Sequence, residues 1–176
     1  MRAASAFKFL LALAVAVVVH AGGLEVWPSF PRAVDVFLVL ALFGALGGNL
    51  VAGLFGGMVA GLVMDALTGP RLYGLHGLAN TVVGYGTAWA SQRLVIQRAS
   101  GVMLIFALGA AVQQALLVGL LVALLPSPEV PTSPWLLAKV GSTSLLGWAF
   151  FLGRGELRRR SERWRRSRTG KLRFGG

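Results

Sequence analysis

The 29 residues from Val36 to Met64, VFLVLALFGALGGNLVAGLFGGMVAGLVM, contain no charged side chain. A helix needs roughly 20 apolar residues to cross the hydrocarbon core of a bilayer. As a single helix this stretch would be about 43 Å long, which fits the core only with a large tilt. The segment Gly44-Ala-Leu-Gly-Gly-Asn49 in its middle is typical of a turn. We therefore expect two shorter helices, about 34–46 and about 49–66, joined by a tight glycine-rich turn.

The composition of the whole chain agrees with this interpretation. Of the 176 residues, 56% are hydrophobic and only 13% are charged, whereas a soluble domain carries about 25% charged residues. We therefore expect an all-α integral membrane protein. Four further apolar runs have the length of a span, at about 6–24, 72–92, 101–125 and 134–153. The sequence thus predicts a six-helix transmembrane domain over residues 1–153 and a basic tail over residues 154–176.

The charge distribution predicts the orientation of these helices. The net charge of the chain is +11, and the tail from Arg154 onward carries +8 of it. The positive-inside rule places this tail in the cytoplasm. With six spans the N-terminus is cytoplasmic as well, whereas a five-span alternative, in which Val36 to Met64 is one helix, places it outside. We expect Lys139 to reach the interface, and the outer side receives the charges of Glu25, Arg32, Asp35, Asp65, Arg71 and Glu129.

The apolar run that follows Arg2 and Lys8 also resembles a secretory signal with a small-residue cleavage site. We expect this run to remain in the protein as the first span, because further spans follow it.

A ridge of small residues distinguishes the third predicted helix. Residues at every fourth position lie along one side of a helix, and glycines there let a second backbone approach closely in lipid. We therefore expect this ridge to pack against another helix or to contact a partner. A glycine followed by Pro70 predicts the end of the helix. The ridge consists of Gly53, Gly57, Gly61, Asp65 and Gly69, and Gly74 and Gly77 follow in the next segment.

Asp65 is the exception on this ridge, because it is anionic. An anionic side chain in the last turn of a helix is disfavoured by the helix dipole, so it needs water or a partner. Arg71 and His76 are the nearby candidates. Two interpretations remain open: Asp65 fixes the turn between the third and fourth helices, or it lines a cavity or a protein contact.

Other polar residues give little indication of catalysis. The chain has no cysteine, which excludes disulfides, zinc–thiolate sites and thiol nucleophiles. A glutamine in the middle of a membrane helix usually bonds a neighbouring helix. We therefore predict a non-enzymatic protein with no catalytic residue, no cofactor and no metal site. The candidates for lining a cavity are Asn49, His76, Asn80, Gln113 and Gln114.

The basic tail has two interpretations. Glu156 and Arg160 are spaced as partners on a helix, so a short helix that continues from the membrane is expected. Its arginines could contact anionic lipid, or they could bind an acidic cytoplasmic protein. We do not expect nucleic-acid binding, since the +8 of this tail is explained by orientation in the membrane. The residues concerned are Arg158, Arg159, Arg160, Arg163, Trp164, Arg165 and Arg166.

The layout of six short spans, together with one motif, resembles the bacterial rod shape-determining protein MreD family. The motif is Gly57-x-x-x-Gly61-x-x-x-Asp65-x-x-x-Gly69, followed by Gly74, Gly77-Leu and Gly84-Tyr85. The resemblance implies a fold like that of the substrate-binding S-component of energy-coupling-factor importers. It also implies that the motif residues shape the packing of the third and fourth helices and a possible central cavity.

The same resemblance implies a non-enzymatic scaffold of the cell-wall elongation machinery in the bacterial plasma membrane. Such a protein binds the single-span protein MreC. Through it the family is linked to the MreB filament and to the glycosyltransferase and transpeptidase that build peptidoglycan. A homodimer formed through the glycine ridges is a further expectation. The alternative is that the chain is itself the S-component of a vitamin transporter.

Overall fold

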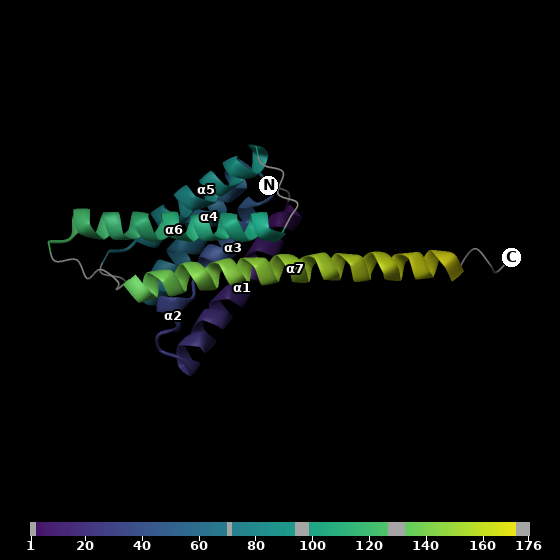
Figure 1. The fold of residues 1–176 in the computed structure, drawn as a ribbon, viewed down its shortest axis with the longest axis horizontal. Coiled ribbons are helices and arrows are strands. Elements are labelled where there is room, and N and C mark those ends of the chain that lie inside the picture. Colours follow the sequence, from purple (N-terminus) through teal and green to yellow (C-terminus); the bar gives the residue numbers. More distant parts are fainter. Residues whose placement is uncertain (1–2, 70–71, 94–98, 127–132, 172–176) are drawn as a thin grey trace.

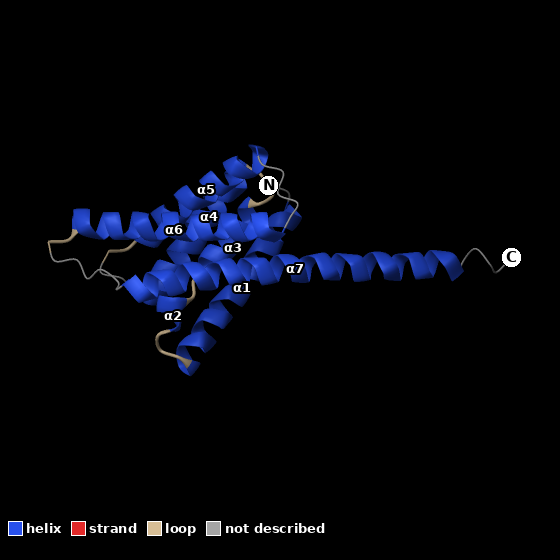
Figure 2. Cartoon of the chain, in the orientation of Figure 1, coloured by secondary structure: helices blue, strands red, loops and turns tan. Residues whose placement is uncertain are grey.

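The computed structural model describes residues 3–69, 72–93, 99–126 and 133–171, and over these residues the chain forms helices and no strand (Figures 1 and 2). The predicted all-α class is therefore confirmed. The helices are α1 (Ala3–Val26), α2 (Phe30–Ala33), α3 (Val36–Ala45), α4 (Leu50–Thr68), α5 (Leu75–Arg93), α6 (Ala99–Leu124) and α7 (Ser133–Lys171).

Four of these helices are long and apolar enough to cross a membrane. They contain the segments Ser5–Val26, Leu50–Thr68, Ser100–Leu124 and Pro134–Gly153. The ten residues of α3 cover about 15 Å, which is half of the hydrocarbon core. The sequence of α5 has the length of a span but carries more polar side chains. The structure thus supports four spans, and the six-span arrangement stays a prediction.

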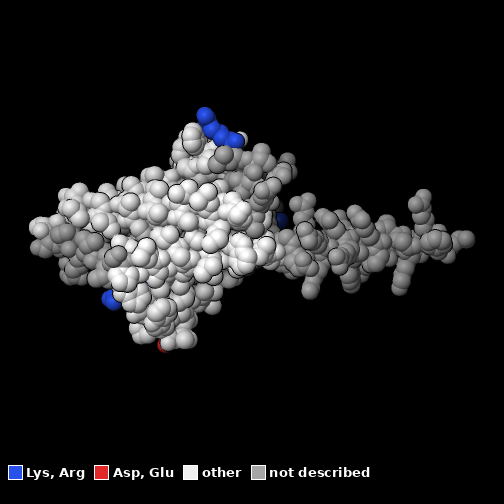
Figure 3. Space-filling model, in the orientation of Figure 1, with Lys and Arg blue, Asp and Glu red and all other residues white. Residues whose placement is uncertain are grey.

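The surface of the bundle agrees with a membrane environment. On the face shown in Figure 3, charged side chains lie at the edges and the area between them is uncharged. Large apolar side chains are strongly exposed, among them Phe7 at 68%, Val18 at 71% and Phe150 at 64%. Such a surface is suited to lipid or to other helices, not to water.

The predicted glycine-rich turn is confirmed. Between α3 and α4, Gly48 has a φ of 71°, which only glycine adopts readily. The side chain of Asn49 caps α4, because its Oδ1 accepts a hydrogen bond from the Ala52 amide at 3.0 Å. Gln92 at the end of α5 donates to the Gly48 carbonyl at 2.8 Å. The helix is therefore broken at this point, and the alternative of one long helix over residues 36–64 is wrong.

The short helix α3 lies at the centre of the bundle. It contacts α1, α4, α5, α6 and α7, and most of its apolar residues are buried, as in a core helix. On one side Leu38 and Leu42 pack with Val83 and Phe106. On the other side Phe37 belongs to a second cluster, which also contains Leu13, Ala16, Ala41, Ala60 and Met64.

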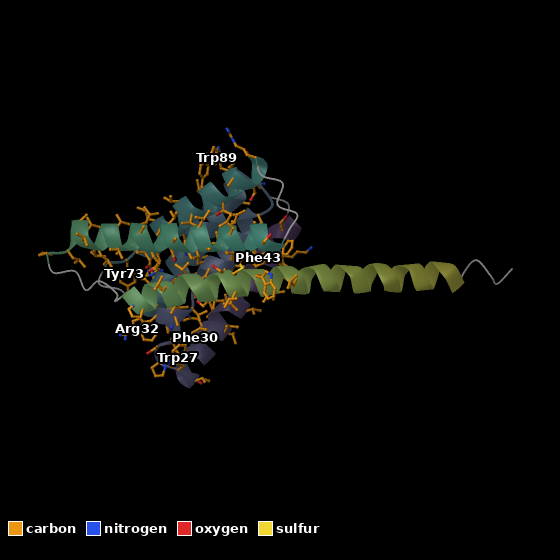
Figure 4. The ribbon with its side chains drawn as sticks, in the orientation of Figure 1. Trp27, Phe30, Arg32, Phe43, Tyr73 and Trp89 are labelled. Carbon is orange, nitrogen blue, oxygen red and sulfur yellow. The ribbon has the colours of Figure 1, made fainter. Side chains whose placement is uncertain are left out.

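The two ends of the bundle differ. Figure 1 shows α6 and α7 side by side in opposite directions, with α7 projecting far beyond the other helices. The beginning of α1 and the end of α5 lie at the end from which α7 projects. At this end the guanidinium of Arg93 lies over the ring of Trp89, 4.6 Å from its centroid. Trp27, Arg32 and Tyr73 lie toward the other end (Figure 4).

Candidate functional site

The glycine ridge lies on α4, the third predicted helix, and it is the contact surface for α5, the fourth predicted helix. This helix pair has the most extensive contact in the fold. A Cβ atom built on Gly53 would lie 2.5 Å from the Gly84 carbonyl oxygen, and Cβ atoms on Gly57 and Gly61 would overlap other carbonyls of α5. The predicted role of the ridge in helix packing is thus what the structure shows. Because α5 of the same chain covers these glycines, they do not offer a surface to a second copy.

The remaining glycines of the motif shape the connection between α4 and α5. Gly69 ends α4 in the left-handed conformation, with a φ of 55°, and its amide donates to the Asp65 carbonyl at 3.1 Å. This is the predicted helix end. Gly74 has a φ of 93°. A Cβ on Gly77 would lie 2.8 Å from Cδ2 of Leu62, so this glycine packs closely against the Leu62 side chain of α4.

Asp65 is buried, with 1% exposure, and its carboxylate binds the beginning of α5. Oδ2 accepts hydrogen bonds from the amides of Gly74 at 3.0 Å and Gly77 at 3.1 Å. Oδ1 accepts from the His76 amide at 3.3 Å and lies 2.7 Å from the His76 ring Nδ1. The first amides of a helix lack partners within it, and the dipole there favours an anion.

This geometry answers the question raised by the sequence. Asp65 stands near the unfavourable end of α4, but it interacts with the favourable end of α5. His76 is its side-chain partner, and Arg71 lies outside the described residues. Of the two interpretations, the contacts correspond to fixing the turn between the helices.

A second buried carboxylate, Asp35, occupies the beginning of α3. Its Oδ1 accepts a hydrogen bond from the Leu38 amide at 2.8 Å, which caps the helix. Its Oδ2 accepts from Nε2 of Gln113 at 2.8 Å and lies 3.5 Å from Nζ of Lys139 on α7. Asp35 is fully buried, and the side chain of Lys139 is 10% exposed.

These contacts add a feature that the sequence analysis did not expect. Asp35, Asp65 and Lys139 are all buried within the protein, and their positions relative to the two sides of the membrane stay predictions. A charged side chain can be buried when an opposite charge and hydrogen bonds replace the water that it loses. Sequence reasoning missed the pair because its two members lie far apart along the chain.

Gln113 joins this pair to α5. Its Nε2 donates both to Asp35 and to Oδ1 of Asn80, at 2.8 Å each. Nε2 of Gln114 donates to Oε1 of Gln113 at 3.2 Å. Residues of α5 and α6 are thus joined to the cap of α3 by hydrogen bonds, and Lys139 of α7 joins it by an ion pair. We call Asp35, Asn80, Gln113, Gln114 and Lys139 the polar network.

Several buried polar atoms near these helices have no hydrogen-bond partner among the described residues. They are Nδ2 of Asn80, Oγ of Ser91, Oγ1 of Thr143 and both ring nitrogens of His20. The His20 ring packs against Phe37, with centroids 5.4 Å apart. Buried polar atoms without partners are uncommon in proteins, and water or a bound molecule usually satisfies them.

The other candidates of the sequence lie elsewhere. Asn49 is exposed and caps α4, so it does not line the interior. The basic candidates of the tail lie on the helical backbone of α7, and their side chains lie outside the described part of the structure: Arg158, Arg159, Arg160, Arg163, Trp164, Arg165 and Arg166.

Neither a metal site nor a similar known protein identifies the function of this chain. In the described part of the chain, no group of three or more histidine and acidic side chains could hold a metal ion. No protein-family model matches the chain, and neither a curated protein nor a solved structure is significantly similar to it. The functional interpretation therefore rests on the residues and their geometry.

Proposed function

We propose that this chain is a non-enzymatic membrane scaffold of the bacterial cell-wall elongation machinery, of the kind that the MreD family represents. One observation carries the proposal. The motif on which the resemblance rests is a single structural unit, in which the glycines of α4 pack on α5 and Asp65 binds the amides that begin α5. A motif used in this way builds a closely packed helix pair, which supports a scaffold role.

The disposition of charge also favours a scaffold. Inside the bundle, the acidic groups of Asp35 and Asp65 are bonded to amides and to side chains of the same protein. The outer surface is apolar, with side chains such as Leu10 and Leu104 exposed at 59% and 60%. A protein that keeps its polar groups inside and its apolar groups outside is suited to contacts with other membrane helices.

In the proposed arrangement the chain lies in the plasma membrane with both termini in the cytoplasm. The basic end of α7 is then cytoplasmic, as the positive-inside rule expects. The partner is MreC, whose single span contacts an apolar face of the bundle. Through MreC the scaffold links the MreB filament to the glycosyltransferase and the transpeptidase.

Helix α1 is our candidate for the face that meets the partner span. It packs mainly against α2 and α3, and its outer residues Phe7, Leu11 and Val18 are exposed at 59% to 71%. Co-purification tests the proposal: the full chain and the MreC of the same genome, expressed together, should elute as one complex in mild detergent. Separate elution of two folded proteins would contradict it.

A second candidate function is supported by the unpartnered polar atoms. An S-component of a vitamin transporter binds its substrate between its helices, where convergent polar groups orient it. Nδ2 of Asn80 and Oγ1 of Thr143 are buried donors of this kind. A thermal-shift screen of the purified protein against vitamins separates the two functions, because stabilisation at nanomolar concentration by one vitamin would favour transport over the scaffold.

A further inference from the structure

The last helix continues without interruption from the bundle into the space beyond it. Its apolar part is Pro134–Gly153, which at 1.5 Å per residue measures about 30 Å and matches the hydrocarbon core. The helix then extends to Lys171, a further length of about 27 Å. Figure 1 shows this part as a straight extension of α7, in line with the segment that packs on α6.

The charges of this extension are unevenly distributed along it. We call residues 154–162 the proximal segment and residues 163–171 the distal segment. The proximal segment contains four arginines and two glutamates. The distal segment contains five basic residues and no acidic one: Arg163, Arg165, Arg166, Arg168 and Lys171.

Distance decides which charges can meet lipid. The headgroup region adds roughly 5 to 7 Å on each side of the hydrocarbon core, which four to five helical residues cross. An average tilt of about 20° shortens the projection only slightly. The distal segment therefore lies about 8 to 20 Å beyond the headgroups. Because the Debye length is about 8 Å at physiological ionic strength, the surface potential of the membrane is largely screened there.

The positive charges of the distal segment also repel one another along the helix. Arg163 and Arg166 are three residues apart, as are Arg165 and Arg168, and like charges at this spacing destabilise an isolated helix. Trp164 is the one large apolar residue of this segment. A helix with dense positive charge is electrostatically complementary to an acidic helical segment.

We propose that the distal segment is a docking site for an acidic helical segment of a cytoplasmic protein. In this arrangement the proximal segment lies at the anionic headgroups. The distal segment, held away from the membrane by the helical extension of α7, binds the partner. This inference depends on insertion of the bundle in the membrane and on the cytoplasmic position of the tail, and it does not depend on which scaffold or transporter the bundle is.

Two variants with equal charge loss test this proposal. The distal variant replaces four arginines by glutamine, and the proximal variant does the same closer to the membrane. Glutamine keeps a high helix propensity, so the backbone of α7 is retained. The distal variant is Arg163→Gln, Arg165→Gln, Arg166→Gln and Arg168→Gln, and the proximal variant is Arg154→Gln, Arg158→Gln, Arg159→Gln and Arg160→Gln.

The measurement is site-specific photo-crosslinking of the full chain in native membranes. A photoreactive residue replaces Ser167 in the distal segment, and a separate variant carries it at Phe150, which faces outward from the bundle with 64% exposure. We expect position 167 to give a protein adduct whose crosslinked peptide, identified by mass spectrometry, is acidic. The yield should fall about tenfold in the distal variant and less than twofold in the proximal variant.

Three outcomes would overturn the proposal. Lipid adducts alone at position 167 would assign the distal segment to the membrane. Equal losses in the two variants, or a crosslinked peptide that is not acidic, would mean that the distal charges do not select the partner. The absence of any protein adduct at position 167, with adducts at position 150 in the same membranes, would show that the segment has no docked partner.

Discussion

The Asp65 carboxylate in the last turn of α4 lies 2.7 Å from ring Nδ1 of His76 in the first turn of α5. It also accepts hydrogen bonds from the amides of Gly74, His76 and Gly77. One side chain therefore satisfies the amides at the beginning of the next helix, which an ordinary cap would satisfy from within its own segment. This links the end of α4 to the beginning of α5, the same two helices that the glycine ridge holds in contact.

Replacing Asp65 by Asn tests this link. An asparagine keeps one acceptor oxygen but turns an NH₂ group toward amides that need an acceptor. We expect a loss of about 1 to 3 kcal/mol in the free energy of unfolding, the cost of leaving buried donors unsatisfied. Thermal unfolding in mild detergent measures it. An unchanged melting temperature would mean that water replaces the carboxylate, and the link would then be unimportant for the fold.

The neighbouring glycines Gly56 and Gly57 provide a matched pair for the helix contact. A Cβ on Gly57 would overlap the Asn80 carbonyl, whereas a Cβ on Gly56 would lie 3.5 Å from the Phe9 ring, an ordinary contact. Gly57→Ala should lower the free energy of unfolding by about 1 to 3 kcal/mol, because the added methyl group overpacks the helix contact. Gly56→Ala should leave stability unchanged or raise it by up to about 1 kcal/mol, since alanine favours helix. Equal effects on the melting temperature would contradict the close contact of α4 and α5.

The buried pair of Asp35 and Lys139 predicts strong coupling between two substitutions. Either Lys139→Met or Asp35→Asn alone leaves the other side chain of the pair without its partner. We expect each of these substitutions to lower the free energy of unfolding by about 3 to 5 kcal/mol. The double variant should recover much of that loss, because no unpaired charge remains. A double-mutant cycle on unfolding measures the coupling. Additive losses would show that the two side chains do not interact.

Some features of the fold follow from local rules, and others do not. The turn at Gly48 and the end of α4 at Gly69 could be predicted, because each depends on glycine at a positive φ within a few residues of sequence. The ridge on α4 could be predicted as well, from spacing alone. Spacing alone could not show that α5, and not a partner, covers the ridge, because the partner of a small-residue surface is decided by tertiary packing; the family resemblance was what implied the packing of these two helices.

The polar network shows the other limit of local reasoning. Local rules place Asp35 and Lys139 at membrane interfaces, because charges are costly inside the bilayer. The structure shows in addition that α3 and α7 bring the two charges together inside the protein, with Gln113 bonded to the same carboxylate. The glutamine in a mid-membrane position is the one signal of a buried network in the sequence. Helix α3 begins at Val36, about two residues later than expected, because the buried side chain of Asp35 caps it there.

The topology can be tested with single cysteines, because the natural chain has none. The beginning of α1 lies at the same end of the bundle as the projecting part of α7 (Figure 1). Cysteines at Ser5 and Ser167 should therefore react with a membrane-impermeant maleimide only after the cells are opened. A cysteine at Tyr73, which is 73% exposed toward the other end, should react in intact cells. Labelling of positions 5 and 73 from the same side would contradict this arrangement.

The most direct test of the scaffold function is rescue of cell shape. The full chain, expressed with the MreC of its own genome, is placed in a rod-shaped bacterium whose MreC and MreD have been depleted, and cell width is measured by microscopy. We expect rods to return with the natural chain and Gly57→Ala to give rounder cells, while Gly56→Ala behaves like the natural chain. Cells that stay round with the natural chain correctly inserted, and with MreC present in normal amount, would contradict the scaffold function.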